Sequence, residues 1–221
     1  MKTSVPQVKR EILETGKRLY GRGYIASNDG NISARLDARR ILITPTRMSK
    51  GFMKADDLVV IDLQGRKITG KRKPSSESLL HLEIYRHRPD VKSVCHAHPP
   101  YATAFAVAGR SFESHVLPEV VINLGNVPLV PYGTPGTPEF FAPLLPFLPA
   151  FDAFLLANHG ALTVGVDVES AYHKMETLEH YAHILFLAEQ LGTVNTLDKE
   201  KVEKLVALRG NFGARKGLGT Y

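Results

Sequence analysis

The chain has 221 residues and a formal net charge of +6, with 43% hydrophobic and 23% charged residues. This length is enough for one sizeable α/β domain, and the composition is that of an ordinary globular protein. No apolar run reaches the roughly 20 residues that span a bilayer, and the N-terminus has no apolar signal core, so we expect a cytoplasmic protein without a membrane partner. The only cysteine, Cys95, cannot form an internal disulfide, which suits a reducing compartment.

The positive charge does not predict a nucleic-acid partner. Basic residues are interleaved with acidic ones along the chain, and the densest basic run, residues 70–74, is short. A nucleic-acid surface needs a basic stripe or a reading motif, and the sequence shows neither. A basic balance also suits a small anionic substrate, which the protein would attract electrostatically.

Hydrophobic periodicity and turn residues divide the chain into alternating helices and strands. In chain order, the pattern predicts a helix at 6–22, a loop at 26–31, strands at 40–44 and 58–63, a helix ending near 87, a strand at 91–98, and a helix at 101–108. It then predicts a strand at 120–123, a short helix at 138–147, strands at 154–157 and 161–164, and helices at 168–190 and 199–208. This alternation without a linker predicts one α/β domain over residues 1–221, with helices on both faces of a sheet.

The helix that ends near residue 87 begins at a pair of serines. Ser75 or Ser76 is expected to cap it, with Glu77 in its first turn. Glu77 can complement the helix dipole through a capping-box contact, or it can lie near a metal ion and transfer protons. The sequence leaves both roles open.

Histidines form the strongest local signal. In Cys95-His96-Ala97-His98, the two histidines are two residues apart at the end of a predicted strand, so their side chains point to the same face. His159 lies in a tight turn between two apolar strands, beside Gly160. Three imidazoles at two strand ends, with an open side, describe a catalytic site for a divalent metal, most naturally Zn²⁺. Packing or surface roles are expected for the other histidines, at positions 81, 87, 115, 173, 180 and 183.

Three polar loops are able to hold a phosphate. They cover residues 29–33, 44–47 and 74–77. The glycine of the first loop lets the backbone approach an anion, and its asparagine offers an amide donor. The third loop lies at a predicted helix N-terminus, where free N–H groups and two hydroxyls favour an anion. Each loop, taken alone, is also explained by ordinary turn and capping chemistry.

Taken together, these motifs resemble the class II aldolase/adducin family over nearly the whole chain. Five segments occur in the family's order: Gly30-Asn31-Ile32-Ser33, Ile43-Thr44-Pro45-Thr46, Lys73-Pro74-Ser75-Ser76-Glu77, His96-Ala97-His98-Pro99 and Asn158-His159-Gly160-Ala161. Five motifs in this order are far more specific than any one of them. Within the family, the pattern is most similar to that of the enzymes that cleave L-fuculose 1-phosphate.

The resemblance implies a fold, an assembly and a metal site. The expected fold is a single three-layer αβα domain with a mostly antiparallel central sheet. The expected assembly is a homotetramer with its sites near the subunit interfaces. One Zn²⁺ per subunit would be held by His96, His98 and His159, with Glu77 as a further ligand when substrate is absent.

The resemblance also implies a substrate and a reaction. The residues expected to bind the substrate phosphate are Gly30, Asn31, Thr46, Arg47, Ser75 and Ser76. Glu77 would leave the metal and act as the acid and base. The metal would stabilise the enediolate that remains after C–C cleavage, as a Lewis acid. The expected reaction converts a ketose phosphate into dihydroxyacetone phosphate and a small aldehyde.

Two positions depart from the aldolase pattern. Arg47 stands where the aldolases usually have glycine, and its side chain can clasp the phosphate or point to solvent. Leu117 stands near the position of the tyrosine that donates a proton toward the aldehyde. Glu119, two residues further on, is the candidate to replace that proton donor.

Other activities of the same fold stay open. A 4-epimerase, a dehydratase or a decarboxylase would use the same metal and phosphate sites. A non-catalytic, adducin-like interaction module is a different class of alternative. Such modules lack an intact metal set, whereas this chain has all three histidines and Glu77.

Overall fold

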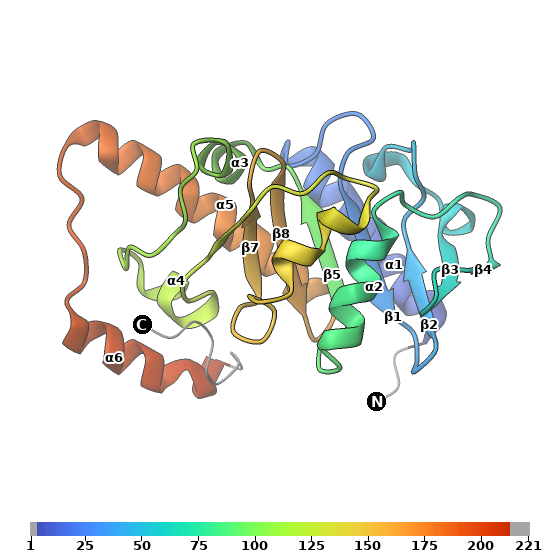
Figure 1. The fold of residues 1–221 in the computed structure, drawn as a ribbon. Helices are drawn as coiled ribbons and strands as arrows, with labels where there is room; N and C mark the ends of the chain where they lie inside the picture. Colours follow the sequence, from blue (N-terminus) through green and yellow to red (C-terminus); the bar gives the residue numbers. More distant parts are fainter. Residues whose placement is uncertain (1–3, 213–221) are drawn as a thin grey trace.

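The computed structural model describes residues 4–212, and in this part of the chain eight strands form one sheet (Figure 1). The strands are β1 (Asn31–Arg35), β2 (Arg40–Ile43), β3 (Val59–Asp62), β4 (Lys67–Thr69), β5 (Ser93–Ala97), β6 (Leu129–Val130), β7 (Ala153–Leu156) and β8 (Gly160–Gly165). Their order across the sheet is β4-β3-β2-β1-β5-β8-β7-β6. Every neighbouring pair is antiparallel except β6 and β7, which confirms the expected mostly antiparallel sheet.

The helices lie on both faces of this sheet. They are α1 (Val5–Gly21), α2 (Ser78–His87), α3 (Pro100–Val107), α4 (Pro118–Asn123), α5 (Val168–Leu191) and α6 (Lys199–Leu208). Short 3₁₀ turns occur at η1 (Lys50–Phe52), η2 (Ala55–Asp57), η3 (Pro138–Phe140), η4 (Ala142–Leu144) and η5 (Arg209–Phe212). Figure 1 shows α2 in front of the sheet and α5 behind it. Within residues 4–212, none of the helices has the length and apolar character needed to cross a bilayer.

Two hydrophobic cores, one on each face, give the three αβα layers. The first core joins the sheet to α1, α3 and α5, and the second joins it to α2 and the η3–η4 segment. Strand residues alternate between the two cores, because successive side chains of a strand point to opposite faces. In β2, for example, Leu42 belongs to the first core, whereas Ile41 and Ile43 belong to the second.

The strand predicted at 120–123 is wrong, because this segment belongs to helix α4. Its β-branched residues favoured a strand, but Pro118 occupies the first turn of a helix, where its fixed φ fits. Val120, Val121 and Ile122 are buried, and α4 packs against α6 and α5. Tertiary packing therefore outweighs the local strand preference of these residues.

The start of α2 and several short elements also differ from the predictions. Neither serine caps α2: Glu77 is at the N-cap position, and its side chain makes no capping hydrogen bond. The structure adds three strands that the sequence pattern did not show, β1, β4 and β6. The helix predicted at 138–147 is replaced by the two separate turns η3 and η4.

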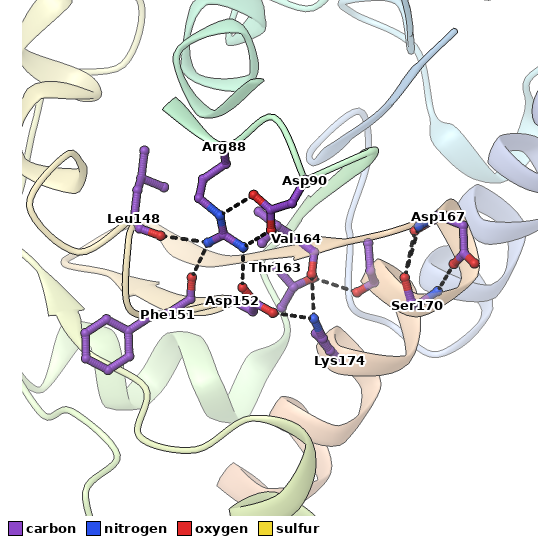
Figure 2. Close-up of polar contacts among 11 residues, drawn as sticks. Arg88, Asp90, Leu148, Phe151, Asp152, Thr163, Val164, Asp167, Ser170 and Lys174 are labelled. Atoms are coloured by element: carbon purple, nitrogen blue, oxygen red, sulfur yellow. Dashed lines mark hydrogen bonds and ion pairs between the residues drawn. The ribbon is translucent and has the colours of Figure 1, made fainter. Parts of the chain in front are cut away.

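A buried ionic cluster holds the layers together at the end of the sheet opposite the histidines. Arg88 follows α2 and donates hydrogen bonds to the carboxylates of Asp90 and Asp152 (Figure 2). It also donates to the carbonyl oxygens of Leu148 and Phe151. Lys174, on α5, donates to the same Asp152 and to the carbonyl oxygen of Val164 on β8. One carboxylate therefore links α2 to α5 across the sheet. Its distance from the histidines makes it part of the scaffold.

Candidate metal centre and anion-binding loops

His96 and His98 project together from the end of β5, as their spacing predicts. His96 is fully buried in the strand, and His98 is the first residue after it. The backbone N–H of His98 donates to the carbonyl oxygen of Tyr24, which holds the end of the strand against the loop before β1. The Nε2 atoms of His96 and His98 are 3.2 Å apart.

His159 joins this pair from the turn between β7 and β8. Its ring centroid is 4.8 Å from that of His96 and 5.0 Å from that of His98. Two unusual backbone positions make this turn possible. Asn158 has a φ of 56°, in the left-handed region. A Cβ atom on Gly160 would lie 2.6 Å from the His98 ring and from the carbonyl oxygen of Ala97, so only glycine fits there.

The three imidazoles fit a metal ion. One ligand atom from each histidine can be chosen so that all three lie within 4.8 Å of one another. His96 Nδ1 donates to the carbonyl oxygen of Ala161 at 2.8 Å, which leaves Nε2 without a proton and directed toward the other histidines. Burial lowers the pKa of His96 to about 3, so the ring is neutral at pH 7, the form that binds a metal.

Glu77 completes the cluster. Its Oε2 lies 3.3 Å from His96 Nε2, and its Oε1 lies 3.5 Å from His159 Nε2. Burial alone would raise the pKa of this carboxyl group, but the neighbouring His96 and the hydrogen bonds from His159 and Asn31 outweigh it and hold the pKa well below its usual value. A carboxylate beside three imidazoles is a donor set typical of Zn²⁺ sites.

Two further charged side chains lie around this cluster. Asp29 Oδ2 is 3.6 Å from His98 Nδ1, on the side of the ring away from His96. Lys50 is 2% exposed and donates to the carbonyl oxygens of Asn28 and Met48, at 2.5 and 2.8 Å. It therefore ties the loop before β1 to the loop after β2. Burial lowers the pKa of Lys50 to about 8.

The second and third of the predicted anion loops lie side by side. Pro45 and Pro74 form an isolated antiparallel bridge. The backbone N–H of Thr46 donates to the carbonyl oxygen of Lys73, and the backbone N–H of Ser75 donates to the carbonyl oxygen of Thr44. The Ser75 hydroxyl accepts from the backbone N–H of Glu77 at 3.2 Å, which links these loops to the histidine cluster.

The individual phosphate candidates differ in how free their side chains are. Ser76 and Arg47 are exposed, and Thr46 is half-buried. Arg47 has a φ of 54°, a conformation that glycine adopts without strain. Asn31 is buried, and both ends of its amide already have partners, Glu77 and His81. Gly30 has a φ of 68° and lies against the carbonyl oxygen of His96.

Glu119 is not part of this cluster within one chain. It is exposed in the first turn of α4, and the structure of residues 4–212 shows no hydrogen bond or ion pair between Glu119 and the cluster. His81, in contrast, was given only a packing or surface role by the sequence pattern, yet it is fully buried and joined to Glu77 through Asn31. The spacing of four residues between Glu77 and His81 on a helix was the signal that could have shown this.

Three clustered histidines with an adjacent carboxylate, at the strand ends of an α/β sheet, form an arrangement that could hold a metal ion in an enzyme. The family model described as "Class II Aldolase and Adducin N-terminal domain" matches residues 10–186. The chain belongs to this class II aldolase and adducin family, whose enzymes are generally metal-dependent and act on sugar phosphates.

Relatives with two different names have nearly equal similarity to this chain. A 3-oxo-tetronate 4-phosphate decarboxylase of Haemophilus influenzae is 35% identical, over 80% of this chain and 86% of the relative. An L-fuculose phosphate aldolase of Methanococcus maripaludis is 34% identical, over 82% and 97%.

Solved structures with related names share the fold. A Klebsiella pneumoniae protein described as a putative aldolase/epimerase/decarboxylase superposes with a TM-score of 0.86 at 33% identity, covering 92% of this chain and 99% of that one. An L-fuculose 1-phosphate aldolase superposes with a TM-score of 0.84 at 30% identity, covering 93% and 96%.

Proposed function

We propose that this protein is a Zn²⁺-dependent lyase that breaks a carbon–carbon bond next to the carbonyl group of a phosphorylated sugar or sugar acid. The observation that carries the proposal is the convergence of His96, His98 and His159 with Glu77, whose backbone N–H donates to the hydroxyl of Ser75 in the adjoining loop. A metal site and an anion site side by side suit a substrate with a carbonyl group and a phosphate.

The chemistry of the metal follows from its donor set. A divalent ion held by the three histidines would supply Lewis-acid polarisation of a substrate carbonyl. Glu77 would join them as a ligand in the absence of substrate and would serve as the proton carrier once substrate is present. Its hydrogen bond from Asn31 Nδ2, at 2.7 Å, holds the carboxylate beside His96 and His159.

The phosphate is assigned to the two adjacent loops at 44–47 and 74–77, together with Gly30 of the first loop. Thr46, Ser75 and Ser76 offer hydroxyl donors, and Gly30 and the start of α2 offer backbone N–H groups. Arg47 is the candidate for a charge pair with the phosphate. Asn31 borders this site through its contact with Glu77, so it orients the acid/base group as well.

The first candidate reaction is aldol cleavage of a ketose phosphate similar to L-fuculose 1-phosphate. A base, for which Glu119 is the sequence-predicted candidate, takes the hydroxyl proton of the carbon that becomes the aldehyde; the C–C bond breaks, and its electron pair stays on the ketose fragment. Glu77, after taking up a proton from water, protonates that fragment, which leaves as dihydroxyacetone phosphate.

The second candidate is decarboxylation of a 3-oxo sugar-acid phosphate. Loss of C1 as CO₂ from a 3-oxo-tetronate 4-phosphate leaves the electron pair on C2, and protonation by Glu77 gives the same dihydroxyacetone phosphate. Relatives with this name are about as similar to the chain as the aldolases are. One observation favours the decarboxylase. Leu117 stands near the position of the tyrosine that an aldolase uses at the aldehyde oxygen, and departing CO₂ needs no such group.

A substrate panel separates the candidates by the fragment that leaves. The purified protein with Zn²⁺ is incubated with ketose 1-phosphates, ketopentose 5-phosphates and 3-oxo sugar-acid phosphates. Dihydroxyacetone phosphate alone does not discriminate, because both reactions produce it, so the aldehyde and CO₂ are measured as well. A 4-epimerase yields an isomer and a dehydratase a dehydrated product. The absence of turnover and of bound metal would leave only the non-catalytic, adducin-like module.

A further inference from the structure

A buried row of five polar side chains runs from Glu77 into the layer between α2 and β1. Glu77, His81 and Tyr85 recur every four residues, so they lie along one face of α2. Asn31 and Ser33 are two residues apart on β1, so they point to the same side of the sheet. The two sets interleave, and each hydrogen bond of the row crosses from helix to strand.

The contacts are continuous along this row. Asn31 Nδ2 is 2.7 Å from Glu77 Oε2, and His81 Nε2 is 2.5 Å from Asn31 Oδ1. His81 Nδ1 is 2.6 Å from Ser33 Oγ, which is 2.7 Å from the hydroxyl oxygen of Tyr85. Asn31, Ser33, His81 and Tyr85 are at most 4% exposed, so water does not compete for these contacts.

The hydrogen bonds of this row fit only one assignment of donors and acceptors. Asn31 turns its NH₂ group toward a carboxylate oxygen of Glu77, which accepts, and its amide oxygen toward His81 Nε2. His81 Nε2 must then carry the proton, which leaves Nδ1 bare. Ser33 donates to that Nδ1 and accepts from the Tyr85 hydroxyl, which remains protonated because burial raises its pKa.

We propose that His81 is a positioning residue that fixes the orientation of the Asn31 amide and thereby holds Glu77 toward His96 and His159. The donor at Nε2 makes the flipped amide unfavourable, because a flip would bring Nδ2 against the N–H of His81 and Oδ1 against the carboxylate. Burial lowers the pKa of His81 to about 4, so the ring stays neutral and its single tautomer persists at pH 7.

The tautomer of His81 is the direct test. Long-range ¹H–¹⁵N correlation spectra of the full chain with ¹⁵N-labelled histidine, with and without Zn²⁺, report which ring nitrogen carries the proton. The His81 signals are assigned by their loss in His81→Asn. A proton on Nε2 and a bare Nδ1 are expected in both states. A proton on Nδ1, or a doubly protonated ring at pH 7, would overturn the proposal.

Two substitutions of His81 test the roles of its two ring nitrogens separately. The side-chain nitrogen of glutamine reaches the place of Nε2, so His81→Gln keeps the donor to Asn31. The side-chain oxygen of asparagine reaches only the place of Nδ1, so His81→Asn loses that donor. The variants are compared by chelator competition for Zn²⁺. His81→Gln is expected to stay within about fivefold of the wild type, and His81→Asn to bind Zn²⁺ about 10–100-fold more weakly, as for groups that orient a metal ligand. Equal losses in both variants would contradict the proposal.

Kinetics add a second comparison, which rests on the proposed function. His81→Asn is expected to lower kcat more than His81→Gln while changing KM by less than about threefold, because Glu77 and not the phosphate loops is disturbed. Ile84→Ala, a buried position of α2 outside the row, controls for loss of stability and should keep its kcat. If the wild type turns over no substrate, the proposed function fails, while the tautomer and the Zn²⁺ competition still decide the role of His81.

Discussion

At the scale of single residues, Glu77 is the side chain on which the proposed chemistry depends. Its two oxygens face His96 and His159, and Asn31 holds it in place. Glutamine preserves the size of this side chain but cannot carry a proton at neutral pH. We therefore expect Glu77→Gln to retain about one metal ion per chain and to lose about 10²–10⁴-fold in kcat.

Metal analysis and steady-state kinetics check this prediction. Glu83→Gln, on the same helix and paired with Arg86 at the surface, is the matched control and should keep its kcat. Near wild-type turnover by Glu77→Gln would show that another group carries the proton. Glu119, the remaining sequence-predicted candidate, would then be tested in the same way.

Arg47 is the second residue whose substitution has a predicted effect on kinetics. It is exposed, it has a left-handed backbone, and it lies beside the proposed phosphate donor Thr46. Arg47→Gly and Arg47→Ala both remove the charge, and only glycine also relieves the backbone. If Arg47 clasps the phosphate, both variants raise KM for phosphorylated substrates and make it less sensitive to salt.

Initial-rate measurements at two ionic strengths separate the explanations for Arg47. A rise of KM in both variants assigns the effect to the charge. A change in Arg47→Gly that is absent from Arg47→Ala would assign it to the backbone instead. Unchanged kinetics in both would show that Arg47 is only a solvated loop residue.

At the scale of elements, Lys50 links the loop before β1 to the loop after β2. Burial lowers its pKa to about 8 from an ordinary value of 10.5, so the unfolded chain binds this proton more tightly than the folded one. Where the unfolded state holds the extra proton, stability rises with pH. Burial of the charged Lys50 therefore lowers the free energy of unfolding below pH 8, and this loss of stability disappears between about pH 8 and 10.5.

Denaturant unfolding of the wild type and Lys50→Met at several pH values measures this effect. The difference in unfolding free energy, wild type minus variant, is expected to grow by about 2 kcal/mol between pH 7.5 and 9.5 in favour of the wild type. Tyrosines that titrate in this range are common to both proteins and cancel. A difference that does not change with pH would mean that Lys50 is not the buried cation described here.

The elements also show what the sequence can predict and what it cannot. The long helix predicted at 168–190 and the helix at 199–208 are confirmed, because their apolar patterns and caps are local. The histidine spacing predicted the shared direction of His96 and His98. The strand β1 was missed because its polar residues Asn31 and Ser33 face α2, and their burial depends on partners 46 to 52 residues away. The segment at 120–123 was mistaken for a strand because its helix is stabilised by distant contacts.

The same limit applies to the site. Its metal trio was visible in the sequence because each histidine lies at a strand end. The residues around Glu77 left helix capping and a place beside the trio equally open, and only the family resemblance implied that Glu77 joins the metal ligands. The role of His81 requires the hydrogen bonds of α2 with β1. The assignment of residues 1–221 to a single domain stays a prediction.

At the scale of the whole molecule, the homotetramer remains a prediction from the family resemblance. Light scattering on the purified protein is expected to give four copies of the 24.4-kDa chain. An assembly with sites near subunit interfaces would also offer a place for Glu119, which is exposed and unattached to its own cluster. A stable monomer with full turnover would contradict both expectations.

The central claim is that Glu77 moves a proton to and from the carbon of dihydroxyacetone phosphate next to its carbonyl, whichever fragment leaves. This half of the reaction is shared by the aldolase and the decarboxylase, so it can be measured without knowing the natural substrate. The protein with Zn²⁺ is incubated with dihydroxyacetone phosphate in D₂O, and exchange at the free hydroxymethyl carbon is followed by NMR. We expect exchange of one of its two hydrogens, lost on chelation and in Glu77→Gln, and much slower exchange with unphosphorylated dihydroxyacetone. No exchange by the Zn²⁺-loaded wild type, or undiminished exchange by Glu77→Gln, would contradict the central claim.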